Sequence, residues 1–138
     1  MREILFRGKS LDFGDWLCGY IRQYESGKIT ICDFETKRLW FVNTETVGQF
    51  TGLTDKNGKK IFEGDVVKFT DSPFGYSCTG VVCFNGGSFC IKYEYWKKEK
   101  LHRIGQTDKW QDMGASGIIT YQYEILGNIH DNPELLEA

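Results

Sequence analysis

Hydrophobic and polar residues alternate along several short stretches of this chain, the pattern of β-strands with one buried face. Residues 89–95 place their aromatic side chains and Ile91 on one face, and Lys92 and Glu94 on the other. Residues 119–125 repeat the pattern with isoleucine and tyrosine at every second position. Both stretches are therefore predicted to be strands that cover a core on one side only.

Other short apolar stretches are separated by turn residues. They predict further strands at residues 4–6, 16–24, 29–34, 39–42, 47–50, 66–71 and 78–84. Residues 39–42 read Leu-Trp-Phe-Val, which is apolar on both faces and predicts an interior strand. Asn57-Gly58 predicts a two-residue hairpin turn with positive φ at both positions, and Glu63-Gly64-Asp65 predicts a second turn.

The predicted fold class is mainly β (a β-rich α+β domain). We expect one domain over residues 1–138, built as a small barrel-like curled antiparallel sheet with a short C-terminal helical tail. Asn132-Pro133 supplies an N-cap and a first helical residue for that tail. Residues 97–117 have no period, so they are predicted to form a loop that is either mobile or functional.

Composition places the chain among soluble globular proteins. The formal net charge is −2, which provides no global field to attract nucleic acid or a membrane. Five cysteines stand at positions 18, 32, 78, 83 and 90 without the close spacing of a zinc knuckle. No apolar segment suggests a signal peptide or a membrane span. We therefore predict a cytoplasmic protein whose thiols are free and mostly buried.

Motifs for chemistry are missing from the sequence. It has no Walker A motif, no GxGxxG and no nucleophile elbow. A calcium loop around Asp55 fails, because its first and twelfth positions are Leu53 and Gly64. Glu63 and Asp65 could form an acid/base pair, but they flank a glycine turn and are expected to accept backbone N–H groups. The prediction is a protein that is not an enzyme, with no catalytic, cofactor or metal residues.

One segment combines aromatic and basic side chains. The candidate nucleic-acid or partner surface comprises Tyr95, Trp96, Lys97, Lys98, Lys100, Arg103, Lys109 and Trp110. Such residues can stack bases and contact phosphates, as single-strand binders do. With Glu94, Glu99 and Asp108 among them, the segment also fits a solvated charged loop whose aromatics pack on the core. Leu135-Leu136 can likewise dock on a neighbouring subunit or on its own sheet.

Three blocks of sequence resemble one family. They are the glycine-rich residues 46–69, the opening residues 1–9 with Trp16 and Gly19 shortly after, and the closing residues 123–136. Together they resemble the YopX-like proteins of bacteriophages and prophages, from one end of the chain to the other. The resemblance implies homo-oligomers inside a bacterial host, and it supplies no catalytic residues.

Three hypotheses for function follow. The first is an accessory protein that acts by binding itself and a host or phage protein, with no membrane contact. The second is a nucleic-acid-binding module of phage DNA metabolism that uses the basic and aromatic segment 92–110. The third, an enzyme, would need a concave site that the sequence does not show.

Overall fold

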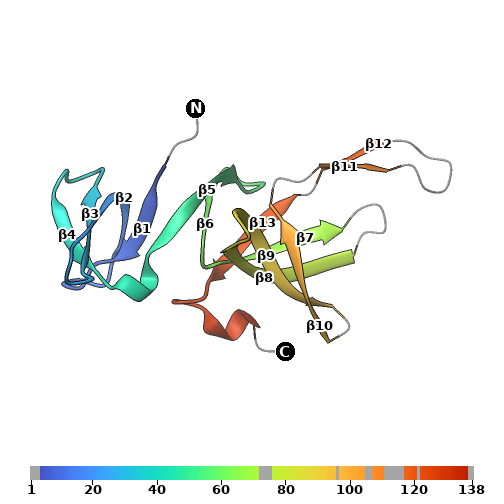
Figure 1. Cartoon of the computed structure of the whole chain (residues 1–138). Helices are drawn as coiled ribbons and strands as arrows, with labels where there is room; N and C mark the ends of the chain where they lie inside the picture. Colours follow the sequence, from blue (N-terminus) through green and yellow to red (C-terminus); the bar gives the residue numbers. More distant parts are fainter. Residues whose placement is uncertain are drawn as a thin grey trace. The chain divides into compact units, whose positions relative to one another are not determined.

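The computed structural model describes residues 4–71, 76–95, 97–104, 107–110, 117–120 and 122–136, and Figure 1 shows their arrangement as strands. The chain divides into two compact units, residues 1–52 and residues 53–138. The elements are β1 (Phe6–Lys9), β2 (Trp16–Gln23), β3 (Ile29–Asp33), β4 (Leu39–Val42), η1 (Thr44–Thr46), β5 (Gly48–Thr54), β6 (Lys60–Phe62), β7 (Asp65–Asp71), β8 (Tyr76–Asn85), β9 (Ser88–Tyr95), β10 (Lys98–Arg103), β11 (Thr107–Trp110), β12 (Gly117–Thr120), β13 (Tyr123–Asn128) and η3 (Pro133–Leu136).

The first unit is built on an antiparallel sheet with the strand order β4-β3-β2-β1-β5, and β6 follows β5 in that order. Ile31 and Val42 are buried on one side of this sheet. Gly8 lies against both side chains, since a Cβ at Gly8 would stand 3.2 Å from each. The sheet curls enough for Ser10, just after β1, to form a bridge with Val42 of β4.

The second unit contains a five-stranded antiparallel sheet with the order β10-β9-β8-β7-β13. Buried side chains of its inner face form one core cluster with Ile61 of β6: Val67, Phe69, Val82, Ile91 and Tyr123. Ile91 belongs to this core, Tyr93 packs against it and Phe89 is buried, as the alternation along residues 89–95 predicts. A separate pair, β11 and β12, forms a two-stranded ladder.

The glycine-rich block forms hairpin turns, but the turn at Asn57-Gly58 differs from the prediction. Only Gly58 has positive φ (82°), whereas Asn57 does not. The Gly58 N–H donates to the Asp55 carbonyl, and the Asp55 N–H donates to the Lys59 carbonyl. The loop is longer than two residues, so a single left-handed glycine suffices to close it.

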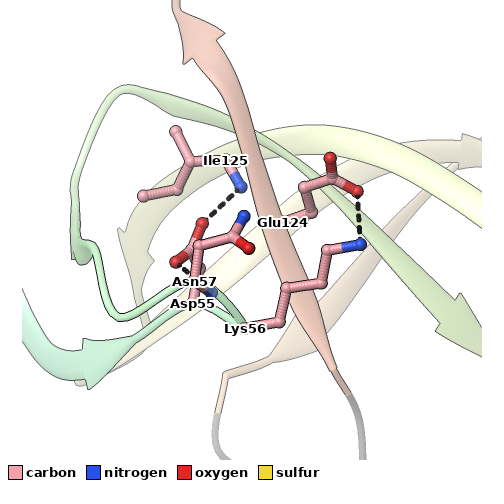
Figure 2. A network of polar contacts seen from close by, with 5 residues as sticks. All are labelled: Asp55, Lys56, Asn57, Glu124 and Ile125. Carbon is pink, nitrogen blue, oxygen red and sulfur yellow. Dashed lines mark hydrogen bonds and ion pairs between the residues drawn. The ribbon is translucent and has the colours of Figure 1, made fainter.

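Asp55 fastens this hairpin to the last strand, as Figure 2 shows. Its carboxylate is 6% exposed and accepts backbone N–H bonds from Asn57 and Lys59 at 2.9 Å each, and from Ile125 of β13 at 3.1 Å. Lys56 adds an exposed ion pair with Glu124 at 3.0 Å. The carboxylate therefore connects segments 70 residues apart in sequence.

Burial alone would raise the pKa of Asp55, but the backbone N–H groups of Ile125, Lys59 and Asn57 together outweigh it and hold the pKa below 3.8.

Asp65 accepts a backbone N–H group at its turn, as the sequence predicts. Asp65 is buried and its Oδ2 accepts the Phe62 N–H at 2.8 Å. Asp55 and Asp65 therefore both stabilise turns by accepting backbone N–H groups.

Two further expectations need correction. The fold is mainly β as predicted, but it consists of open antiparallel sheets and no closed barrel forms among the described strands. Residues 39–42 form the outermost strand of their sheet, where Leu39 and Phe41 are exposed, because both side chains lie on its outward side. The short helical tail is present as a 3-10 helix of four residues, Pro133–Leu136.

The long last strand is also divided. Residues 117–120 pair with β11, whereas residues 123–128 pair with β7. The stretch predicted as one strand therefore forms two strands that belong to two different sheets. Residues 98–103 and 107–110, expected to be loop, are strands. Residues 98–103 show no clear alternation of apolar and polar residues in the sequence, because β10 is an edge strand in which exposed residues occupy most positions.

Candidate functional site

The predicted basic surface lies at the β9–β10 hairpin. Lys97 stands in the turn with a φ of 60°, and Lys98, Lys100 and Arg103 belong to β10, all of them exposed. Tyr95, Lys109 and Trp110 lie in strands whose side chains fall outside the description, and Trp96 falls outside the described residues altogether. The structure thus brings together four of the eight predicted residues and leaves the other four as predictions.

Strand alternation divides even those four. Lys98 pairs with Tyr95 and Lys100 with Tyr93, so the two lysines share one side of the sheet. Arg103 points to the other side, because successive side chains of a strand alternate. The edge strand thus offers cations to solvent on both sides, which is also how proteins prevent edge-to-edge pairing.

His102 belongs to the core and not to the basic surface. It is only 9% exposed, its Nε2 lies 2.9 Å from the Tyr123 hydroxyl oxygen, and its ring stacks on Phe69 with centroids 4.7 Å apart. The surrounding sequence, Leu101-His102-Arg103, gives no sign of this burial. The alternation of an edge strand, had it been recognised, would have placed His102 inward.

A hollow of about 530 Å³ opens beside strands β8 and β9, and we call the surface around it the outer face. Its lining residues are Thr79, Gly80, Val81, Lys92, Tyr93, Glu94, Lys97, Glu99 and Leu136. Two lysines and two glutamates line it together with apolar and aromatic side chains, and Lys92 pairs with Glu99 at 3.4 Å. The volume is in the range of a small binding site, but the charges balance in sign.

The C-terminal turn forms one wall of this hollow. Asn128 Oδ1 accepts the N–H groups of His130 and Asp131, at 3.0 and 2.9 Å, and so fixes the turn that precedes η3. Leu135 lies on Gly127, where a Cβ would come within 2.9 Å of its Cδ1. Leu136 remains 47% exposed. One leucine of the tail thus packs on its own sheet, and the other faces solvent.

The cysteines show no activated thiol among the shifts that are resolved. None of the five forms a disulfide, but only Cys90 is buried and the other four are half-buried, so the expectation of mostly buried thiols is wrong. Burial raises the pKa of Cys83, and Cys90 directly opposite it raises that pKa further. A raised pKa keeps the thiol protonated and unreactive at neutral pH.

The part of the chain that the structure describes contains neither a metal-binding cluster nor a membrane-spanning helix. Within the described residues, no group of three or more His, Cys, Asp or Glu side chains is arranged to hold a metal ion. In the same part of the chain, no helix has the length and apolar character needed to cross a membrane.

Comparison with known proteins identifies the family. The family model described as YopX protein matches residues 13–137, which include most of the first unit and nearly all of the second. The chain belongs to the YopX family. A structure described as the crystal structure of protein EF1440 from Enterococcus faecalis is similar to it, with 21% sequence identity over 99% of this chain and 100% of that chain, and a TM-score of 0.49. A search of curated proteins gave no match.

Proposed function

We propose that this YopX protein is a non-enzymatic binding protein of a phage or prophage that acts in the host cytoplasm and self-associates through its outer face. The hollow beside the C-terminal turn is the observation that carries the proposal. An exposed leucine, Leu136, lines a hollow that also contains Val81, Tyr93 and four charged side chains, all in one unit.

The charges of the hollow suit a symmetric pair of copies. In a two-fold interface the same patch meets itself, so the patch must be self-complementary. Lys92 and Lys97 of one copy can face Glu94 and Glu99 of another, while Leu136 enters the opposite hollow. A purely acidic or purely basic hollow could not do this, because like charges would meet across the axis.

Native mass tests the proposal. The wild-type protein should elute as a multiple of 15.9 kDa in size exclusion with light scattering. Leu136→Glu, which buries a charge in the interface, should shift the mass toward 15.9 kDa and weaken self-association at least about tenfold. Deletion of residues 132–138 should do the same.

Leu11→Glu is the matched control, because Leu11 is 63% exposed and belongs to the first unit. This variant should keep the wild-type mass. A wild-type protein that runs as a monomer, or an oligomer that survives both tail variants, would remove the outer face as the interface.

The β9–β10 hairpin supports a second candidate, nucleic-acid binding by the segment 92–110. Lys97, Lys98 and Lys100 are all exposed within four residues. Changing the three to glutamate should abolish any salt-sensitive binding of DNA, because phosphate contacts release counterions. Binding that persists in the triple variant would show that these lysines are not the site.

A further inference from the structure

One side of the first sheet gathers aromatic rings and cations from three strands, β1, β2 and β4. Residues directly opposite each other in antiparallel strands share a side of the sheet. The register pairs Lys9 with Trp16, then Tyr20 with Cys32 and Leu39, and finally Arg22 with Thr30 and Phe41. Arg7 lies on the same side, opposite Cys18. We call this side the aromatic face.

The cations of the aromatic face lie over its rings. The Arg7 guanidinium carbon is 4.7 Å from the Trp16 ring centroid, and the Lys9 ammonium is 5.4 Å from it. Arg22 stands 5.2 Å from the ring of Tyr24, whose own ring is 6.0 Å from that of Phe41. Lys28 lies 5.8 Å from the Phe41 ring. Four positive groups therefore lie 4.7 to 5.8 Å from the centroids of aromatic rings.

The rings are open to solvent. Tyr20 is 61% exposed, although a large aromatic side chain in a strand usually packs against the core. It meets Phe34 edge to face, with ring planes at 84° and centroids 5.0 Å apart. An edge-to-face pair covers only one of the four ring surfaces, so flat surface remains for another planar group.

The strands β1 to β4 place no acidic side chain on the aromatic face. Asp33 is the only acidic residue in β1 to β4, and it lies opposite Gly19, on the other side of the sheet. Its Oδ2 is engaged by the Thr36 N–H at 2.9 Å. The other described acids up to residue 45 stand in the connections between strands: Asp12, Asp15, Glu25, Glu35 and Glu45. The strands thus present rings and positive charge together.

We propose that the aromatic face binds single-stranded nucleic acid. Bases of a single strand can stack on exposed rings such as Tyr20 and Phe34, and the phosphates between them can reach Arg7, Lys9, Arg22 and Lys28. A duplex keeps its bases stacked on each other and offers no base face to the rings. The strand positions of this face carry Arg7, Lys9 and Arg22 and no acidic residue, so the face is complementary to phosphate, whereas a second copy would bring like charges together.

Fluorescence anisotropy tests the proposal with labelled single-stranded DNA, single-stranded RNA and duplex DNA of about 20 nucleotides, which exceeds the about 4 to 16 nucleotides that one small β-domain covers. Single strands should bind and duplex should not. Tyr20→Ala should weaken binding by about 5- to 150-fold. Arg22→Gln with Lys28→Gln should reduce the slope of log affinity against log salt by about 1.4. The DNA and RNA arms identify which single strand is preferred.

Two variants separate this site from the others. Phe84→Ala removes an exposed ring from the second unit and should bind as the wild type does. A Lys97→Gln, Lys98→Gln, Lys100→Gln triple removes the lysines of the competing hairpin site, and loss of binding in this triple alone would assign the oligonucleotide to the hairpin. Photo-crosslinking with bromodeoxyuridine should label Trp16, Tyr20 or Phe34, a readout that does not depend on how a variant folds.

Three results would overturn the assignment. They are no binding of either single strand at low salt, binding that only the lysine triple weakens, and a native mass that falls in Tyr20→Ala while the oligonucleotides remain unbound. The last result would show that the aromatic face binds a second copy of the chain instead of nucleic acid. Loss of mass in Leu136→Glu with oligonucleotide binding intact would keep the two surfaces distinct.

Discussion

Alanine in place of Gly19 should disrupt the first sheet more than any other small substitution in it. Gly19 lies in β2 opposite Asp33, and a Cβ there would stand 1.8 Å from the carbonyl oxygen of Cys32 in the neighbouring strand. A backbone atom cannot rotate out of the way as a side chain can, so β2 and β3 would have to separate. We expect a loss of about 3 kcal/mol or more in the free energy of unfolding, and a melting temperature lowered by about 10 °C or more.

Thermal and urea unfolding, followed by circular dichroism, would measure this loss. Gly27→Ala is the control, because a Cβ at Gly27 meets nothing within 4 Å and only its φ of +88° is unfavourable. That variant should lose about 1 to 2 kcal/mol, the cost of a left-handed residue with a side chain. If Gly19→Ala melted within a few degrees of wild type, the close approach of β2 and β3 at this point would be wrong.

Gly19 also shows what the sequence can reveal of this fold. Alternation located most strands correctly, because an inward side chain at every second position is a local property of one segment. The sequence has 16 glycines. Glycines in turns, such as Gly58, can be predicted from the turn residues beside them. Gly19 and Gly80 are needed for another reason: the backbone of the neighbouring strand passes too close to leave room for a side chain. Nothing near Gly19 in the chain indicates that the Cys32 carbonyl will lie against it.

The candidate sites illustrate the same limit. Lys97, Lys98 and Lys100 are close together in sequence, but only the structure shows that Lys98 and Lys100 share one side of β10 while Lys97 stands in the turn. The aromatic face is the opposite case, because no local pattern announces it. Arg7, Trp16, Arg22 and Phe41 come from three strands, and only the register of the sheet places them on one side.

Asp55→Ala should be the most damaging substitution in the second unit. The change removes the acceptor for three backbone N–H groups, those of Asn57, Lys59 and Ile125. Since the site is buried, donors left without an acceptor cost about 1 to 3 kcal/mol each where water cannot replace it. We expect a loss of about 3 kcal/mol or more, and about 1 to 2 kcal/mol for Asp55→Asn, which keeps one acceptor oxygen.

Lys56→Ala is the matched control for this experiment. It breaks only the neighbouring ion pair with Glu124, whose two side chains are largely exposed. An exposed pair contributes about 0 to 1 kcal/mol. Urea unfolding at neutral pH should therefore rank Asp55→Ala far below Lys56→Ala in stability. Equal stability of the two variants would mean that Asp55 does not hold the hairpin to β13.

The pH dependence of this stabilisation follows from the direction of the pKa shift. Folding lowers the pKa of Asp55 below its ordinary 3.8, because backbone N–H groups favour the charged form more than burial opposes it. The stabilisation is therefore complete above the ordinary pKa and is lost as the pH falls through the lower, folded pKa. The difference in unfolding free energy between wild type and Asp55→Asn should stay constant from pH 7 to about pH 5 and shrink below about pH 4. A difference that shrank instead as the pH rose would require a raised pKa, which the three donors do not allow.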